Sequence, residues 1–194
     1  MIKASRMAVL QRVIPSYRLK LFQSICSNEN LICRFFIGSD ISSSKVKSTR
    51  SLNNLDVHKL PTSFLKLGKN RLIINQRTLI ARLFEFQPDV ILCEGESNVL
   101  SYLKAIWYRR SNPDTGLIHW SLGGLPGSPI TNPLKRIIKR YLLSKFDTFV
   151  VYSSYGKEKL IELGCPSAQI HVAVNVSDTK HHLAVSRNLV LSKE

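Results

Sequence analysis

The sequence predicts an α/β protein in which helices flank a parallel β-sheet. Short apolar runs alternate with longer segments of helical period along most of the chain, and this alternation is typical of a parallel sheet with helical crossovers. The chain has 194 residues, of which 44% are hydrophobic, so it can form one domain with a real core but not two ordinary domains. We expect one domain over residues 1–176, and a linker or tail over 177–194 that is cut short before a further domain.

Seven apolar runs have the length of buried strands. They lie at Met7–Val13, Leu31–Ile37, Val57–Leu60, Val90–Cys93, Leu117–Trp120, Thr148–Tyr152 and His171–Asn175.

Five segments between these runs have the pattern of helices. They lie at Tyr17–Ser27, Thr78–Phe86, Ser97–Arg110, Leu134–Phe146 and Ser154–Leu163. In the third helix one face is apolar and is expected to be buried, and it consists of Val99, Leu100, Leu103, Ile106 and Trp107. Ser97 and Ser154 are the expected N-caps of their helices, and Gly164 is a natural residue to end the last one.

The helix after Asn132-Pro133 is basic and amphipathic. Asn is a good cap and Pro suits the first helical position. One face is apolar, with Leu134, Ile137, Ile138 and Tyr141, and four basic residues are expected to cluster opposite it: Lys135, Arg136, Lys139 and Arg140. These basic residues could face the head groups of an anionic membrane, or they could form the solvated face of an ordinary surface helix.

The net charge restricts the partners of the chain. Lys and Arg number 28 against 13 Asp and Glu, which gives +15 and favours nucleic acid, anionic membrane surfaces or phosphorylated small molecules. Nucleic acid is disfavoured, because no stacking-aromatic motif, helix-turn-helix or zinc pattern accompanies the basic residues. No stretch reaches the roughly 18 apolar residues of a spanning helix. We expect a cytoplasmic protein, with peripheral attachment to the inner face of the plasma membrane as an alternative.

The four cysteines do not suggest a metal or redox site. Cys26, Cys33, Cys93 and Cys165 lie in or beside apolar segments, at spacings of neither a zinc site nor a CxxC pair, so reduced thiols are favoured over disulfides. The five histidines give no metal-ligand pattern either.

Three segments together resemble the N-terminal half of a family 4 glycosyltransferase of the GT-B fold. They are RVIPSYRLKLF after the first strand, PDVILCEGES at the fourth, and FDTFVVYSSYGKEKLIELGCPSAQIHVAVNVSDT from Phe146 to Thr179. The resemblance implies a Rossmann-like N-terminal domain that holds a glycan or lipid-linked acceptor, and a C-terminal domain that holds a nucleotide-sugar donor. It also implies sugar transfer, usually with retention, in the synthesis of a polysaccharide or glycolipid, and no cofactor besides the donor substrate.

The chain departs from the family pattern in two ways. The donor-domain residues, including the paired glutamates seven residues apart, are missing from it, and the glycine-rich loop after the first strand is replaced by residues 14–18, Ile-Pro-Ser-Tyr-Arg. We therefore expect the chain to supply the acceptor-binding half and to depend on a donor domain for activity.

Candidate site residues follow the carboxyl ends of the expected strands, where ligands bind in open parallel sheets. Arg18 could pair with a phosphate or carboxylate, or it could be an exposed residue of a helix start. Glu94 and Glu96 could accept hydrogen bonds from sugar hydroxyls, although a Glu near a helix N-terminus is also favoured by the helix dipole.

The stretch HWSLGGLPG, residues 119–127, contains the catalytic candidate. His119 could deprotonate or orient the acceptor hydroxyl, or it could be a structural histidine at the end of a strand. Ser121, Gly123 and Gly124 could offer backbone N–H groups to an anion, but their spacing matches no nucleotide-binding loop. A close approach or turn of the backbone explains these glycines better.

The missing donor half leaves a second interpretation open. The chain could be a non-enzymatic Rossmann-like module that binds a partner protein or an anionic membrane surface.

Overall fold

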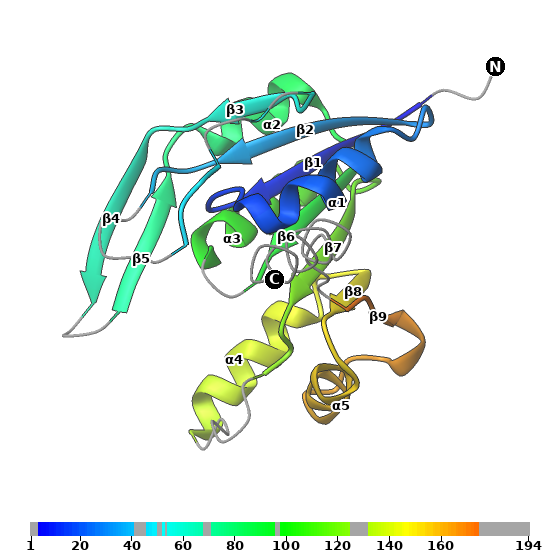
Figure 1. Cartoon of the computed structure of the whole chain (residues 1–194). Helices are drawn as coiled ribbons and strands as arrows, with labels where there is room; N and C mark the ends of the chain where they lie inside the picture. The colour runs from blue at the N-terminus through cyan, green and yellow to red at the C-terminus, as the bar shows by residue number, and fades with distance from the viewer. Residues whose placement is uncertain are drawn as a thin grey trace, which may run out of the picture.

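The protein is a single parallel sheet with helices on both faces, seen here in a computed structural model (Figure 1). The structure describes residues 4–40, 46–49, 52, 54–67, 71–95, 98–124 and 132–174. The seven strands of the sheet are β1 (Ser5–Gln11), β2 (Leu31–Ile37), β3 (Val57–Lys59), β6 (Val90–Glu94), β7 (Gly116–Ser121), β8 (Thr148–Val151) and β9 (Ile170–Val172). All seven expected strands are therefore confirmed, with ends that differ by one or two residues, except that β9 starts earlier than expected and stops at 172.

The strand order is β3-β2-β1-β6-β7-β8-β9, and every neighbouring pair is parallel. The chain first moves outward from β1 to β3 and then returns to continue on the other side of β1 with β6. The order thus reverses between β1 and β6, which makes this position the topological switch point of the sheet.

The helices fall into two layers. They are α1 (Ser16–Cys26), α2 (Leu79–Phe86), α3 (Val99–Ser111), α4 (Pro133–Leu143) and α5 (Ser154–Glu162), and a short 3-10 turn spans Ser167–Gln169. Helix α1 covers one face through Phe22, which packs with Val9, Phe35 and Trp120. The other face forms a larger core with side chains of α2, α3, α4 and α5.

An antiparallel hairpin between β3 and α2 was not predicted from the sequence. Its strands, β4 (Thr62–Leu67) and β5 (Arg71–Gln76), form a separate two-stranded sheet beside the main one (Figure 1). Gln76 joins the hairpin to the body: its Nε2 donates to the Gln11 carbonyl at 2.9 Å, and its Oε1 accepts from Ser101 Oγ at 2.6 Å. All three of these residues are buried, so a polar network fixes this junction.

The buried face predicted for helix α3 was wrong in part, since Ile106 packs against the core but the two ends of the face do not. Val99 and Trp107 are 41% and 46% exposed, whereas the fully buried residues of the helix are Ser101, Ala105 and Tyr108. These three buried residues are spaced i, i+4 and i+7, as expected for the packed face of a helix. This face is rotated from the apolar stripe, and on it Ser101 joins the polar network of Gln76.

The helix caps are partly as expected. Asn132 Oδ1 accepts from the Lys135 N–H at 3.1 Å with Pro133 in the first turn, and Gly164 has φ +89° after α5, so both predictions are confirmed. The cap of α5 is Ser153, whose Oγ accepts from the Gly156 N–H at 3.1 Å, rather than Ser154, which is the first residue of the helix. Ser97 lies outside the described residues.

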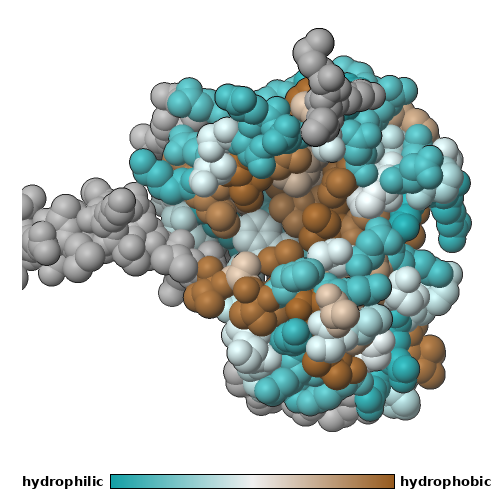
Figure 2. Space-filling model, turned by 90° about the vertical axis from the view of Figure 1, so that its right-hand side faces the viewer, coloured by the Kyte–Doolittle hydropathy of each residue, from teal (hydrophilic) through white to brown (hydrophobic). Residues whose placement is uncertain are grey.

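Helix α4 turns its apolar face away from the protein, whereas most surface helices turn it towards the core. Its apolar stripe points outward, with Leu134, Ile137, Ile138 and Tyr141 all at least half exposed, and its one buried residue is Leu143. The helix projects below the sheet in Figure 1. Figure 2 shows another face, on which hydrophobic residues gather across the middle between hydrophilic ones.

Several other expectations concern the described residues as a whole. The four cysteines are free thiols. Within the described ranges, no helix is long and apolar enough to cross a membrane, and no group of three or more His, Cys, Asp and Glu side chains could hold a metal ion. The expected tail over 177–194 lies outside these ranges, so its assignment stays a prediction.

Candidate functional site

The carboxyl edge of β6 and β7 carries two groups of functional side chains, one on each face of the sheet. Glu94 is in register with Trp120, and Cys93 is in register with His119. Because successive side chains of a strand point to opposite faces, Glu94 and Trp120 lie on the α1 face while His119 and Ser121 lie on the α3–α4 face. Both groups adjoin the switch point.

The first group is the Arg18 cluster, formed by Arg18, Gln11, Glu94, Trp120 and Tyr152. The Arg18 guanidinium donates to Gln11 Oε1 at 2.8 Å, to Glu94 Oε1 at 3.3 Å and to the Tyr152 hydroxyl at 2.7 Å. Its central carbon lies 4.9 Å from the centroid of the Trp120 ring. The Arg18 and Glu94 side chains are only 9% and 15% exposed, so this is a nearly buried ion pair.

The Arg18 cluster closes the end of the sheet at the switch point. Glu94 Oε2 accepts from the Arg12 N–H at 3.1 Å and so links the end of β6 to the residue after β1. Three buried donors of the cluster, Gln11 Nε2, Arg18 Nε and Trp120 Nε1, have no hydrogen-bond partner among the described residues. The structure therefore brings Arg18 and Glu94 together, and each is engaged with the other rather than exposed to a ligand.

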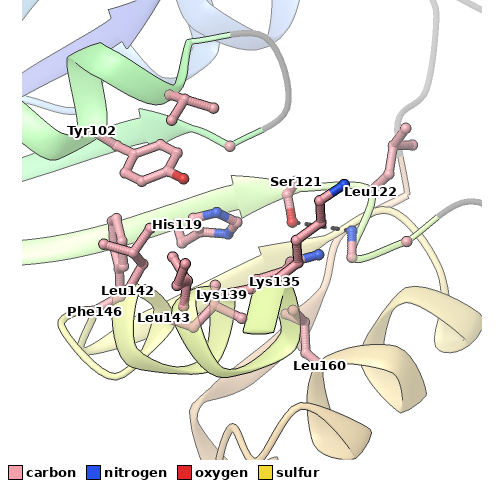
Figure 3. Close-up of a pocket in the computed structure, with 15 residues that line it drawn as sticks. Tyr102, His119, Ser121, Leu122, Lys135, Lys139, Leu142, Leu143, Phe146 and Leu160 are labelled. Atoms are coloured by element: carbon pink, nitrogen blue, oxygen red, sulfur yellow. Dashed lines mark hydrogen bonds between the residues drawn. The ribbon is translucent and has the colours of Figure 1, made fainter. Parts of the chain in front are cut away.

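The second group lines a pocket of about 550 Å³ between the β7 end, α3 and α4 (Figure 3). Most of the lining is apolar, and its polar residues are Tyr102, His119, Ser121, Lys135 and Lys139. Figure 3 shows Tyr102 entering from α3 on one side, and the two lysines entering from α4 on the other. A mainly apolar cavity with a few polar groups is the usual form of a small-molecule site.

His119 is buried among aromatic rings. The centroid of its ring lies 5.0 Å from that of Phe146 and 6.1 Å from that of Tyr102. Burial, together with the positive charge of Lys139, lowers the pKa of His119 from 6.5 to about 4. The imidazole is therefore neutral at pH 7, and its Nδ1 has no hydrogen-bond partner in the described part of the chain.

At two positions of the site, neighbouring atoms lie so close to the backbone that only glycine fits. A Cβ on Gly95 would lie 2.3 Å from His119 Nε2, and a Cβ on Gly123 would lie 2.4 Å from the Gly156 carbonyl oxygen. Gly123 also has φ +77°, a conformation that side chains other than glycine rarely adopt, and its N–H donates to Ser121 Oγ at 3.0 Å. Turning and close packing explain Gly123, whose N–H is already engaged. A Cβ on Gly124 would meet the Lys159 side chain at 3.3 Å.

The four basic residues of α4 do not form one cluster. Lys135 and Lys139 line the pocket, whereas Arg136 donates to the Glu162 carbonyl at 3.2 Å, and the Arg140 guanidinium lies beside Gly164. The four basic residues therefore divide between two neighbours, the pocket and the end of α5, and the expectation that they face a membrane stays a prediction.

The structure thus places His119, Ser121, Gly123 and Gly124 in one pocket, and Arg18 and Glu94 in the cluster behind it. Glu96 lies outside the described residues. The sequence analysis missed Tyr102 and Gly95 as parts of the site. Tyr102 falls on α3 one residue from the buried Ser101, and the buried face predicted for that helix did not include it.

The fold defines the chain as a Rossmann-like domain of the kind that makes up half of a GT-B protein. It aligns with the lipopolysaccharide outer core galactosyltransferase WaaB at a TM-score of 0.54 and 14% identity, over 87% of this chain and 45% of that one. It aligns with Anabaena HepE, solved with UDP and glucose, at 0.58 and 12%, over 90% and 45%. A UDP-N-acetylglucosamine 2-epimerase aligns at 0.55 and 14%, over 89% and 46%.

The sequence profile of Glycosyltransferase Family 4 matches residues 40–181, and the chain belongs to that family. It spans a little under half the length of these solved structures. No curated protein is significantly similar to it in sequence.

Proposed function

We propose that the chain is the acceptor-binding half of a glycosyltransferase that moves a sugar from a nucleotide-sugar donor to a glycan or lipid-linked acceptor. The observation that carries this proposal is the pocket at the carboxyl edge of β6 and β7, with a neutral histidine, a tyrosine and two lysines in an apolar lining. Membership of glycosyltransferase family 4 supports sugar transfer as the reaction. HepE was solved with UDP and glucose, which supports a nucleotide-sugar donor.

The chemistry of the pocket favours an acceptor over a donor nucleotide. A diphosphate is usually held by several free backbone N–H groups at a helix start. Here the Gly123 N–H is engaged by Ser121, and the segment between β1 and α1 is closed by the Arg18 cluster. The apolar lining with Lys135 and Lys139 suits a molecule that has an apolar part and a negative group. We propose that the donor is held by a second domain facing this edge of the sheet.

His119 would orient the acceptor hydroxyl rather than remove its proton. A group with a pKa of about 4 is a weak base at pH 7, and general-base catalysis is most efficient when the pKa lies near the working pH. A neutral imidazole can still donate or accept one hydrogen bond at Nδ1. The family resemblance implies that transfer retains the anomeric configuration.

Sugar transfer by the full gene product tests the proposal. Radiolabelled nucleotide sugars are supplied one at a time with a bacterial lipid extract as acceptor, and both labelled product and released nucleotide are measured. We expect transfer from at least one donor, and about tenfold lower kcat/KM in His119→Gln if one acceptor hydrogen bond is lost. The matched control is His58→Gln, on the edge strand β3 and outside the pocket lining.

Two results would overturn the proposal. Absence of both transfer and hydrolysis with every donor would favour a non-enzymatic module. Transfer that is undiminished in His119→Gln, with folding unchanged, would place the acceptor outside this pocket.

A further inference from the structure

Helix α1 and strand β2 meet in an apolar interface that contains two thiols. The Phe22 ring packs on the Phe35 ring, with their centroids 5.0 Å apart. Cys26 lies about one helical turn beyond Phe22, a step of about 6 Å along the same side of the helix. Cys33 lies two residues before Phe35, a step of about 7 Å along the same face of the strand. Because α1 is the crossover between the parallel strands β1 and β2, it runs opposite to them, and the two steps lead in the same direction.

The two thiols are therefore opposite each other, and their side chains share a hydrogen bond. Both pack against the core on the α1 face of the sheet and keep part of their surface exposed to solvent. The other two cysteines, Cys93 and Cys165, are buried in the core on the opposite face. One pair of the four thiols is thus both close together and accessible.

We propose that Cys26 and Cys33 form a disulfide by exchange with a low-molecular-weight disulfide such as oxidised glutathione. The thiolate of one cysteine attacks a sulfur of glutathione disulfide, which forms a mixed disulfide and releases one glutathione. The sulfur of the second cysteine then attacks the first cysteine's sulfur, which breaks the mixed disulfide and releases the second glutathione. Two protein thiols are oxidised, and one glutathione disulfide is reduced to two glutathiones that take up the two protons.

The hydrogen bond between the thiols makes Cys33 the first to attack. Burial raises the pKa of Cys33, and the hydrogen bond from Cys26 partly offsets this rise because it stabilises the thiolate. Burial and the neighbouring Cys33 raise the pKa of Cys26 to about 12. Both thiols are protonated at pH 7, so exchange is slow, and the pair responds to sustained rather than brief oxidation.

The disulfide would fasten the C-terminal end of α1 to β2. The other end of the helix is already held by Arg18, whose guanidinium donates to Gln11 and Glu94. Cys26 lies about two turns beyond Arg18, so we expect oxidation to stabilise the helix without disturbing the Arg18 cluster. This inference does not depend on the proposed function.

Thiol counting and mass spectrometry of the purified chain test the proposal. The chain is incubated at about pH 8, where more thiolate is present than at pH 7, with rising ratios of oxidised to reduced glutathione. After an acid quench, the remaining thiols are counted in denaturant. We expect the count to fall from four to two, with the chain lighter by two hydrogen atoms and no glutathione attached. Trypsin leaves both cysteines in one peptide, residues 21–34, whereas cleavage after Glu29 gives two pieces that should stay joined until they are reduced.

Single variants test the order of attack and the effect on stability. Cys26→Ser should retain glutathione on Cys33 as a mixed disulfide, and Cys33→Ser should react more slowly. The matched control is Cys165→Ser, at a buried cysteine outside the pair, which should form the disulfide as the original chain does. Oxidation should raise the Tm of the original chain by about 5 °C, and it should not raise that of Cys26→Ser.

Three results would overturn the proposal. They are retention of all four thiols in the most oxidising buffer, a disulfide that joins two chains or involves Cys93 or Cys165, and equal attachment of glutathione to all four cysteines. Circular dichroism establishes that each variant folds. No sugar donor enters these measurements, so their failure leaves the proposed function untouched.

Discussion

The Arg18 cluster and the His119 pocket lie at the same edge of the sheet, back to back, and differ in how they accommodate a buried ionisable group. Glu94 and Gly95 are neighbours in sequence, as are His119 and Trp120, yet one residue of each pair belongs to each group. The cluster keeps its charges and pairs them, with Arg18 Nη1 3.3 Å from Glu94 Oε1. The pocket holds its histidine neutral. The cluster is therefore closed, while the pocket stays open to a ligand.

The difference follows from the chemistry of the two side chains. A guanidinium cannot lose its proton under ordinary conditions, so a buried Arg18 needs acceptors, and Gln11, Glu94 and Tyr152 supply them. An imidazole can lose its proton at little cost, so His119 needs no counter-charge. A residue that follows a strand is therefore expected to lie near the site. The chemistry of its side chain then decides whether it is available to bind a ligand.

The largest expected effect is that of breaking the Arg18 cluster. Arg18→Met leaves the Glu94 carboxylate nearly buried without its ion pair, and we expect the free energy of unfolding in urea to fall by about 3 kcal/mol. Adding Glu94→Gln to this variant should restore part of the loss, because the side chain that faced Arg18 is then neutral. Arg82→Gln breaks an exposed pair with Glu85 and should cost much less than Arg18→Met, because solvent screens the pair. Equal losses in Arg18→Met and Arg82→Gln would contradict a closed, energetically coupled cluster.

Acid should destabilise the pocket through His119. Its pKa in the folded protein, about 4, lies below the 6.5 of a free imidazole, so the unfolded chain binds the proton more tightly. The stability gained from the neutral ring is fully present above about pH 6.5 and is lost as the pH falls towards 4, by about 3 kcal/mol in total.

This loss is measured by urea unfolding between pH 7 and pH 4. His119→Gln should lose about 3 kcal/mol less over this range than the original chain, and His171→Gln, at an exposed position, should lose as much as the original. Identical pH profiles for His119→Gln and the original chain would mean that the ring titrates normally.

Gly95 separates the cluster from the pocket and should tolerate no side chain. Because a Cβ would lie 2.3 Å from His119 Nε2, Gly95→Ala should lower the free energy of unfolding by about 2 kcal/mol. In a His119→Ala background the same substitution should cost clearly less, since the clashing ring is gone. Additive costs in the double variant would show that the two residues do not contact each other in this way.

The sequence predicted the sheet better than the surfaces of the helices. The strands were recognised because a buried parallel strand is a short apolar run, and all seven were found. The hairpin β4–β5 was missed, and its junction depends on Gln76 meeting Ser101, a contact between residues 25 apart that periodicity does not reveal. The buried face of α3 was misjudged for a related reason, because a helical period shows which residues share a face but not which face meets the core. For the same reason the sequence did not indicate that the apolar stripe of α4 points outward.

The sequence indicated where the candidate residues lie on the sheet, but not which contacts they make with one another. The rule that ligands bind beyond the carboxyl ends of strands located His119, Ser121, Arg18 and Glu94. The rule could not show that Arg18 and Glu94 are paired, because 76 residues separate them in the chain. It also gave no sign that Lys139 enters the pocket from α4.

The smallest effect concerns Lys139, which contributes to the low pKa of His119. Its positive charge disfavours the imidazolium, so Lys139→Gln should raise the pKa of His119, although burial, the larger cause, will keep it below the ordinary value. Arg140→Gln removes the same charge from the next position, whose side chain lies beside Gly164 rather than in the pocket, and should leave the pKa of His119 unchanged. The His119 Cε1–H resonance, followed by NMR against pH, measures both variants. If the two substitutions change the pKa of His119 equally, the histidine responds to the overall charge of α4 and not to Lys139 in particular.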